Sequence, residues 1–354
     1  MEYRSVMVTG VYGFIGAHLM KYLVKKYPKT RFIGVDKISY CSNVKNIKEI
    51  NSSDNFIMKE NDINDLIKMQ EIVNDYNIDC IIHLAAYSAV DLSFETPLNF
   101  TLNNVLGTHA LLELTKNNKS IKRFIYMSTD EVYGPTKEYV NEEYTQYNPT
   151  NPYSATKAAA EMLCKAYITS YNLPIIITRA NNIYGENQFH EKVIPKFVKQ
   201  IMNCEAITIH GNGSVLRNFL HVKDFCDAYD YILTKGKLHE IYNIGGEYEI
   251  SIKDLAEKMI YLMKTDKEIQ RIISFTQKEY LNNSIEKIIY IKDRPFNDNF
   301  YHINCDKIHK LGWNEKIQFD SEEGFVSIIR HYVESNIKNE MLKQLYYMVE
   351  HDYN

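Results

Sequence analysis

The sequence predicts an α/β fold, in which a doubly wound parallel sheet is followed by a smaller α/β domain. Short apolar segments alternate with helical patterns along the first half of the 354-residue chain. This alternation is typical of strand–helix–strand units with parallel strands. The first strand leads into a glycine turn and a helix, and a second strand ends in an acidic residue about twenty positions later. Together these observations predict a sheet of the Rossmann type.

The glycine turn follows a strand predicted at residues 6–9, and its glycines are Gly10, Gly13 and Gly16. Glycine lets the backbone turn sharply and approach a pyrophosphate, whose charge meets the amino end of the next helix. The second strand, residues 31–35, leads to Asp36. Its carboxylate is expected to bind the adenosine ribose hydroxyls and to repel a ribose phosphate, so NAD is favoured over NADP. An ordinary turn before an ordinary helix is the alternative.

The other elements of the sheet continue this pattern. Further strands are predicted at residues 56–59, 79–84, 121–128 and 174–178, with helices at 104–117 and 153–171. Beyond Arg179 the alternation of strands and helices becomes less regular. There we interpret residues 181–185 as a turn cluster, expect a helix to open at 191–195, and predict strands at 207–211 and 241–245.

Composition excludes several classes of function. The formal net charge is −4, which argues against a dedicated nucleic-acid surface. The chain starts without a signal-peptide pattern, and no apolar segment approaches membrane-spanning length. The six cysteines are scattered, which indicates reduced thiols instead of disulfides or a zinc site. We expect a cytoplasmic protein with no nucleic-acid, membrane or metal partner.

The stretch from Ser128 to Lys157 carries the candidate chemistry. Asp130 and Glu131 follow a predicted strand at its carboxyl end, the edge where doubly wound sheets bind ligands. Tyr153 and Lys157 are four residues apart, so on a helix they share one face. An ammonium beside a phenol favours the phenolate, which can act as a base near neutral pH. The alternative is a solvated turn and a helix that merely carries Tyr and Lys.

Three basic residues of the second half, Lys192, Arg217 and Arg294, lie on predicted loops or at helix starts. Each alone is more typical of a solvated surface. As a set beside a dinucleotide domain, they are expected to clamp a second diphosphate.

Together these stretches resemble an extended short-chain dehydrogenase/reductase, and specifically a nucleotide-sugar 4,6-dehydratase. The matching runs are residues 9–16, Asp36-Lys37, 83–86, 128–134, 151–157, 191–195, 242–245, 293–295 and 311–313. Sister sugar epimerases share the glycine turn and the Tyr-x-x-x-Lys pair but typically lack Thr129-Asp130-Glu131. That run is therefore the specific signal.

The resemblance implies a mechanism. Tyr153 removes the C4 hydroxyl proton while NAD accepts the C4 hydride, Lys157 lowers the tyrosine pKa and holds the nicotinamide ribose, and Thr129 hydrogen-bonds the C4 oxygen. Glu131 then removes the C5 proton and protonated Asp130 donates to the departing C6 hydroxyl. The hydride returns to C6, which gives the 4-keto-6-deoxy sugar used for rhamnose-type deoxysugars.

The resemblance also implies the binding residues and the domains. The expected NAD contacts, besides the three glycines, Tyr153 and Lys157, are Phe14, Ile15, Asp36, Lys37, Asp62, Ile63, Leu84, Ala85 and Ala86. The expected nucleotide-sugar contacts are Ser88, Thr129, Asn182, Glu191, Lys192, Arg217, Asn243 and Arg294. The domains are 1–178 for NAD, with part of 218–240 returning to it, 179–335 mainly for the nucleotide sugar, and a C-terminal tail at 336–354.

Tyr87, Ala89 and His190 depart from the family pattern, and Tyr87 is expected near the sugar or the nicotinamide. The resemblance leaves UDP-glucose and dTDP-glucose open as substrates, with a tilt toward UDP-glucose, and implies a homodimer formed through helices 104–117 and 153–171. Two other functions stay open. One is a nucleotide-sugar 4-epimerase, and the other is a non-catalytic protein that binds NAD and a nucleotide sugar.

Overall fold

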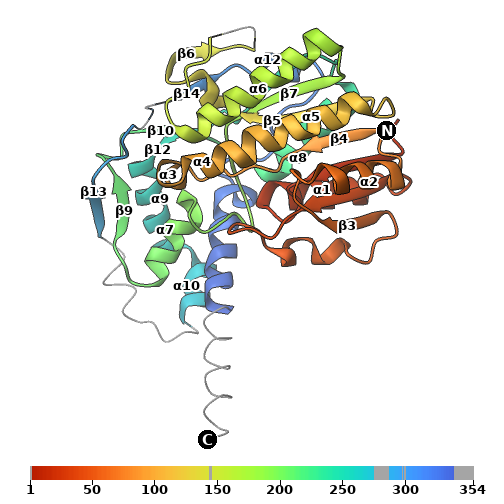
Figure 1. Ribbon diagram of the computed structural model, residues 1–354. Helices are drawn as coiled ribbons and strands as arrows, with labels where there is room; N and C mark the ends of the chain where they lie inside the picture. Colours follow the sequence, from red (N-terminus) through yellow and green to blue (C-terminus); the bar gives the residue numbers. More distant parts are fainter. Residues whose placement is uncertain (1, 143–145, 275–286, 297, 299, 339–354) are drawn as a thin grey trace, which may run out of the picture. The chain divides into compact units, whose positions relative to one another are not determined.

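The computed structural model describes residues 2–142, 146–274, 287–296, 298 and 300–338 (Figure 1). The chain divides into two compact units. The first unit comprises residues 1–183, 218–247 and 298–316, and the second comprises 184–217, 248–297 and 317–354. Most of the tail expected at 336–354 lies outside the described residues. What each unit binds stays a prediction at this point.

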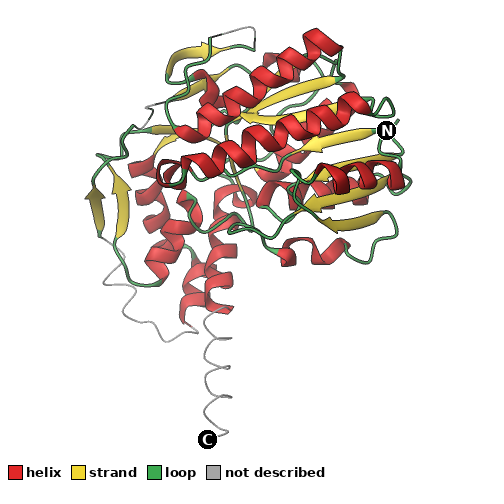
Figure 2. Cartoon of the chain, viewed as in Figure 1, coloured by secondary structure: helices red, strands yellow, loops and turns green. Residues whose placement is uncertain are grey.

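The first unit is built on a parallel sheet of seven described strands, in the order β3-β2-β1-β4-β5-β7-β11. Figure 2 shows strands in yellow and helices in red. The strands are β1 Ser5–Thr9, β2 Arg31–Asp36, β3 Phe56–Glu60, β4 Cys80–His83, β5 Arg123–Thr129, β7 Ile175–Ala180 and β11 Ile241–Ile244. Every neighbouring pair is parallel. The strand order reverses between β1 and β4, which confirms a doubly wound sheet with its switch point there.

Alternation along each strand explains why both faces of the sheet are covered by helices. On β1, Val6 and Val8 pack into one core cluster and Met7 into the other, and all three are fully buried. Successive side chains of a strand point to opposite faces, so a strand that is apolar throughout needs a layer on each side. The sequence of β1 therefore requires two helical layers.

The helical layers come from different parts of the chain. The first core cluster includes residues of α1 Phe14–Lys26, η1 Val44–Ile50, α8 Val222–Lys235 and α12 Asp306–His309. The second includes residues of α2 Leu66–Tyr76, α5 Gly107–Asn117 and α6 Pro152–Tyr171. In Figure 1, α5 and α6 run side by side, and the two helices are in contact. The remaining elements of the first unit are α3 Val90–Glu95, α4 Pro97–Phe100, η2 Thr101–Leu106, η3 Asp130–Tyr133, β6 Thr136–Val140 and β14 Tyr301–Ile303.

Two expectations about this unit require correction. The helix predicted from residue 104 begins earlier, at Pro97, because proline is well suited to the first turn and the following η2 residues stay helical. The turn cluster predicted at 181–185 instead contains a strand, β8 Asn182–Tyr184, beside β10 Leu216–His221. Ile183 and Tyr184 are buried, and burial of β-branched and aromatic side chains favours the extended backbone over a turn.

The second unit contains helices and short strands. They are α7 Val193–Met202, β9 Ile207–His210, β12 Glu249–Ser251, α9 Ile252–Thr265, α10 Lys267–Ser274, β13 Ile288–Ile291 and η4 Glu322–Val326. Strands β9 and β13 form a parallel pair. Within the described part of the chain, no helix combines the length and the apolar character that crossing a membrane requires.

Candidate active site

The carboxyl ends of the parallel strands bring the predicted functional residues of the first unit to one edge of the sheet. Strand β1 ends at Thr9, β2 at Asp36, β4 at His83 and β5 at Thr129. The Thr9 hydroxyl accepts hydrogen bonds from the Leu84 and Ala85 amides, both over 3.2 Å. This edge is where ligands bind in doubly wound sheets.

The glycine turn is packed too tightly for other residues. Gly10 has φ +80°, and a Cβ there would lie 2.8 Å from the Ala85 amide nitrogen. A Cβ on Gly16 would lie 2.0 Å from the Gly10 carbonyl oxygen. Gly13 caps α1 without a side-chain hydrogen bond, and no acidic residue occupies the first turn, where Phe14 and Ile15 lie. The amino end of α1 therefore keeps its amide groups and positive dipole for an anion such as a pyrophosphate.

The acidic end of β2 fits a ribose better than a ribose phosphate. Asp36 accepts hydrogen bonds from the Tyr12 and Lys37 amides over 2.7 and 2.8 Å. Burial raises the pKa of Asp36 to about 6, so the carboxylate is still mostly ionised at pH 7. Lys37 points its ammonium at Asp62, 2.8 Å away, so its charge is already paired. A negative group with a neutralised neighbour favours NAD over NADP.

The other residues predicted to contact the cofactor lie along the same edge. Leu84, Ala85 and Ala86 follow β4 and are partly buried. Ile63 is 4% exposed and packs into the core cluster that contains α5. Its side chain is therefore enclosed, which leaves the backbone as the part that can reach a ligand.

Two asparagines each hold one of the adjacent carboxylates. Asn181 Nδ2 donates to Asp130 Oδ2 over 2.6 Å, and Thr129 donates to Asp130 Oδ1 over 3.1 Å. Asn151 Nδ2 donates to Glu131 Oε2 over 2.9 Å. Asp130 is 3% exposed. The carboxylates follow each other in sequence but have different partners, and such different environments let two carboxyl groups differ in protonation.

Helix α6 is started by the same asparagine that holds Glu131. Asn151 Oδ1 accepts from the Ser154 amide over 2.8 Å and the Ser154 hydroxyl accepts from the Asn151 amide over 3.3 Å, which is a capping box. Pro152 occupies the first helical turn. Because Asn151 caps the helix and binds the carboxylate, the position of Tyr153 is tied to that of Glu131.

Tyr153 lies beside these carboxylates and hydrogen-bonds the Thr129 side chain. The sequence led us to expect that Lys157 lowers the Tyr153 pKa, and this role stays a prediction. Burial, Glu131 and Asp130 raise the pKa of Tyr153. The Lys157 ammonium instead donates to the Met127 carbonyl over 2.5 Å and lies 4.5 Å from the Tyr126 ring centroid. The sequence spacing put Tyr153 and Lys157 on one helix face but could not fix where the ammonium points.

The residues predicted to bind the second ligand are divided between the units. Ser88 and Asn182 are exposed in the first unit, whereas Glu191, Lys192, Arg217 and Arg294 belong to the second. Lys192 is the N-cap residue of α7 and Arg217 lies on β10.

Asn243 differs from the other predicted substrate residues because it is 0% exposed. Its Nδ2 donates to the carbonyls of Val140 and Asn304 over 3.1 and 3.0 Å. Its Oδ1 accepts from the Tyr133 hydroxyl over 2.9 Å. The side chain therefore anchors the segments that follow β5 instead of facing a ligand.

Tyr87 packs on the side of the predicted cofactor residues. Its ring meets those of Tyr40 and Phe100 edge-on, at 5.5 and 5.7 Å between centroids. The Lys37 ammonium lies 5.5 Å from the Tyr87 ring centroid. Asn104 bonds both the amide and the carbonyl of Tyr87 and also reaches Thr156 on α6.

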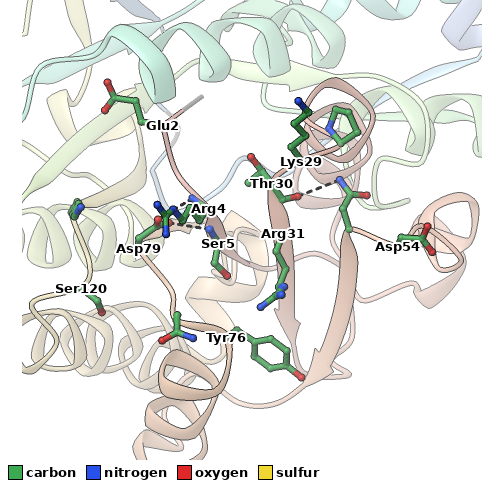
Figure 3. A pocket seen from close by; sticks show the side chains of 14 residues that line it. Glu2, Arg4, Ser5, Lys29, Thr30, Arg31, Asp54, Tyr76, Asp79 and Ser120 are labelled. Carbon is green, nitrogen blue, oxygen red and sulfur yellow. Dashed lines mark hydrogen bonds between the residues drawn. The ribbon is translucent and has the colours of Figure 1, made fainter.

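A pocket at the opposite edge of the sheet has a different character (Figure 3). It is lined by residues at the amino ends of strands, among them Ser5, Arg31 and Asp79, with basic and acidic side chains mixed. The Asp79 carboxylate accepts hydrogen bonds from the Arg4 and Ser5 backbone amides. Ligand binding in doubly wound sheets occurs at the carboxyl ends of the strands, so we do not assign chemistry to this pocket.

Sequence reasoning missed the roles of Asn151 and Asn181. Asn151 was part of a matched run, but nothing local indicated that it reaches Glu131, 20 residues away. Asn181 was assigned to a turn, and its contact with Asp130 spans 51 residues. The pairing of β5 with β7 brings Asn181 next to Asp130, and the start of α6 brings Asn151 next to Glu131.

Comparison with known proteins supports the motif-based resemblance. The family model of GDP-mannose 4,6 dehydratase matches residues 7–322. A dTDP-D-glucose 4,6-dehydratase of Dictyostelium discoideum is 42% identical over 91% of this chain and 80% of its own. A trifunctional UDP-glucose 4,6-dehydratase/3,5-epimerase/reductase of Arabidopsis thaliana is also 42% identical, over 94% of this chain. The match spans only 48% of the plant protein, about half its length.

A solved structure agrees with this result. The dTDP-glucose 4,6-dehydratase of Bacillus anthracis, crystallised in complex with NAD, has a TM-score of 0.80 and 32% sequence identity, covering 93% of this chain and 96% of that one. The matched regions contain the glycine turn, the Thr-Asp-Glu run and the Tyr-x-x-x-Lys helix. The chain therefore belongs to the GDP-mannose 4,6 dehydratase family, within the extended short-chain dehydrogenases/reductases.

Proposed function

We propose that the protein is an NAD-dependent nucleotide-sugar 4,6-dehydratase, a hydro-lyase that converts UDP-glucose or dTDP-glucose to the 4-keto-6-deoxy sugar. The observation that carries this proposal is the pair of adjacent carboxylates beside Tyr153, each held by a different asparagine. A dehydratase needs one carboxyl group to accept a proton and another to donate one. An epimerase needs neither, since no water is lost.

The family resemblance implies the role of each side chain. In its phenolate form, Tyr153 accepts the C4 hydroxyl proton, and Thr129, bonded to Tyr153, orients the C4 oxygen. Glu131 is the more exposed carboxylate and removes the C5 proton. Asp130 is the buried one and, when protonated, donates to the C6 hydroxyl as it leaves as water.

The residues present fit NAD, which when bound supplies the acceptor and later the donor of a hydride. The α1 amino end and the turn at Gly10 suit its pyrophosphate, and Asp36 suits its adenosine ribose. The hydride must return to the same sugar within one turnover. We therefore expect tightly bound dinucleotide in the purified protein.

Replacing Asp36 with alanine should weaken NAD binding by about 10- to 100-fold, the value of a hydrogen bond to a charged group. The measurement is calorimetric titration of dinucleotide-free protein with NAD. Asp75→Ala, an exposed carboxylate on α2, is the matched control and should bind like the wild type. If Asp36→Ala binds NAD as tightly as the wild type, Asp36 does not bind the adenosine ribose.

One incubation tests the function itself. The protein is mixed with UDP-glucose or dTDP-glucose and the product is weighed by mass spectrometry. Loss of one water supports the dehydratase. An unchanged mass with a galactose product supports a 4-epimerase, and no reaction with either sugar supports a non-catalytic binding protein. The two substrates are compared side by side, because one methyl group distinguishes the bases and contributes only about 1–3 kcal/mol.

We also propose that the protein is a cytoplasmic homodimer formed through the face of α4, η2 and α6. Leu98, Leu102 and Leu106 follow each other at one-turn spacing and are 76%, 56% and 50% exposed. Met162 on α6 is 59% exposed, and α6 contacts both α4 and η2. An apolar stripe of this kind is typical of a helical interface.

We expect Leu102→Glu to convert the dimer to a monomer, because the interface would then bury an unpaired charge. Sedimentation velocity at micromolar concentration measures this. Ile67→Glu changes an equally apolar exposed side chain on α2 and should stay dimeric. A monomeric wild type would refute the assembly.

A further inference from the structure

A fully buried ion pair lies next to Lys157 and takes no part in the steps above. Glu161 is on α6, one turn after Lys157, and Arg179 is on β7. Arg179 Nη2 donates to Glu161 Oε2 over 2.6 Å, and Arg179 Nε donates to both carboxylate oxygens over 3.0 and 3.2 Å. The two side chains are 0% and 1% exposed. A bidentate pair of this kind holds the guanidinium and the carboxylate in a defined orientation.

Aromatic side chains pack around this ion pair. The Tyr147 hydroxyl donates to Glu161 Oε2 over 3.0 Å. The Arg179 guanidinium lies 4.4 Å from the Tyr133 ring centroid and 5.3 Å from that of Tyr147. Because water is excluded, solvent screens the charges of this pair only a little, while Arg179 partly neutralises the Glu161 carboxylate.

Lys157 is such a neighbour. It is 4% exposed, and burial of an ammonium favours its neutral form. The titratable groups that face it from the packed elements are Tyr153, Glu161 and Cys164 of α6, Tyr126 of β5 and His83 of β4.

Glu161 is the counter-charge in this set. Burial raises the pKa values of Tyr126, Tyr153 and Cys164, so these groups are neutral near pH 7. Burial lowers the pKa of His83 to about 3, so it is neutral too. Burial lowers the pKa of Lys157 to about 8, and Glu161 opposes that shift.

We propose that Glu161, fixed in place by Arg179, is a positioning residue that keeps the Lys157 ammonium charged and directed at the Met127 carbonyl. Residues four apart on a helix lie on one face, so Glu161 and Lys157 share a face of α6. Arg179 stops the carboxylate from turning away and compensates for its burial. The link to catalysis rests on the proposed function, because Lys157 matters only if this site carries out the reaction.

The test is the titration of Lys157 in full-length protein carrying ¹³C-labelled lysine, with the Lys157 resonance assigned from a Lys157→Arg variant. The double variant Glu161→Gln/Arg179→Gln removes both charges and leaves two amides that can hydrogen-bond each other. We expect the Lys157 titration midpoint to fall by about 1–2 pH units. Turnover should then fall most at pH 8 and recover as the pH is lowered. A midpoint within about 0.3 units of the wild type overturns the proposal.

Two further variants keep the test decisive if the double variant does not fold. Glu161→Asp shortens the side chain by one methylene and should lower the Lys157 titration midpoint by less than the double variant does. An unchanged midpoint overturns the proposal. Arg179→Lys loosens the tie between α6 and β7 but keeps the Glu161 charge, so the midpoint should stay or rise. A fall there would assign the effect to loosened packing and overturn the proposal. The titration needs no substrate, so its outcome is separate from any failure of the dehydratase assignment.

Discussion

Replacing Tyr153 with phenylalanine is expected to slow oxidation at C4 by about 10²- to 10⁴-fold, the usual contribution of a positioned acid–base group. The substitution removes the phenolic oxygen that, as the phenolate, would accept the C4 proton and that bonds Thr129. The ring is 9% exposed and would keep its packing. The measurement is NADH absorbance in a single turnover with nucleotide-glucose, in which the variant should leave the dinucleotide oxidised.

The control for this variant is Tyr171→Phe, which removes a hydroxyl from the same helix at a half-exposed position. It should turn over at the wild-type rate. If Tyr153→Phe forms NADH as quickly as the wild type, Tyr153 is not the group that accepts the proton.

Replacing Asp130 with asparagine or Glu131 with glutamine is expected to permit oxidation and then to stall, with product formation lower by about 10²- to 10⁴-fold. The variants are nearly isosteric, and the new amide oxygens can still accept from Asn181 and Asn151. The acid and the base for water loss are gone, however. Enzyme-bound NADH should therefore accumulate.

Glu131→Gln should also shift the pH dependence of the oxidation step. Burial and the Glu131 carboxylate raise the pKa of Tyr153, so removing the Glu131 charge lowers that pKa. The phenolate is then populated at lower pH, and NADH should form at lower pH than in the wild type. Single-turnover absorbance across a pH series measures this.

Glu71→Gln on the exposed side of α2 is the matched control for the charge change and should leave both steps unaltered. If Asp130→Asn and Glu131→Gln release dehydrated product at the wild-type rate, the assigned roles are wrong. The 4-epimerase would then be the better hypothesis.

The sequence by itself determined the sheet and the chemical groups at its edge. Apolar strands and the glycine turn are local patterns, since alternation and backbone freedom depend on residues within one element. They predicted β1, β2 and the helix that carries Tyr153 and Lys157 nearly to the residue. The Thr129-Asp130-Glu131 run indicated the specific chemistry through its resemblance to nucleotide-sugar 4,6-dehydratases.

The tertiary structure alone decided how these groups are held. Asn181 reaches Asp130 across 51 residues, and the direction of the Lys157 ammonium is set by the Met127 carbonyl on a neighbouring strand. Asn243 became an enclosed anchor through partners on three separate segments. Hydrogen-bond partners and burial depend on which distant segments pack together, and no local pattern carries that information. The sign of the Tyr153 pKa shift followed from the same packing, because burial and two carboxylates raise that pKa.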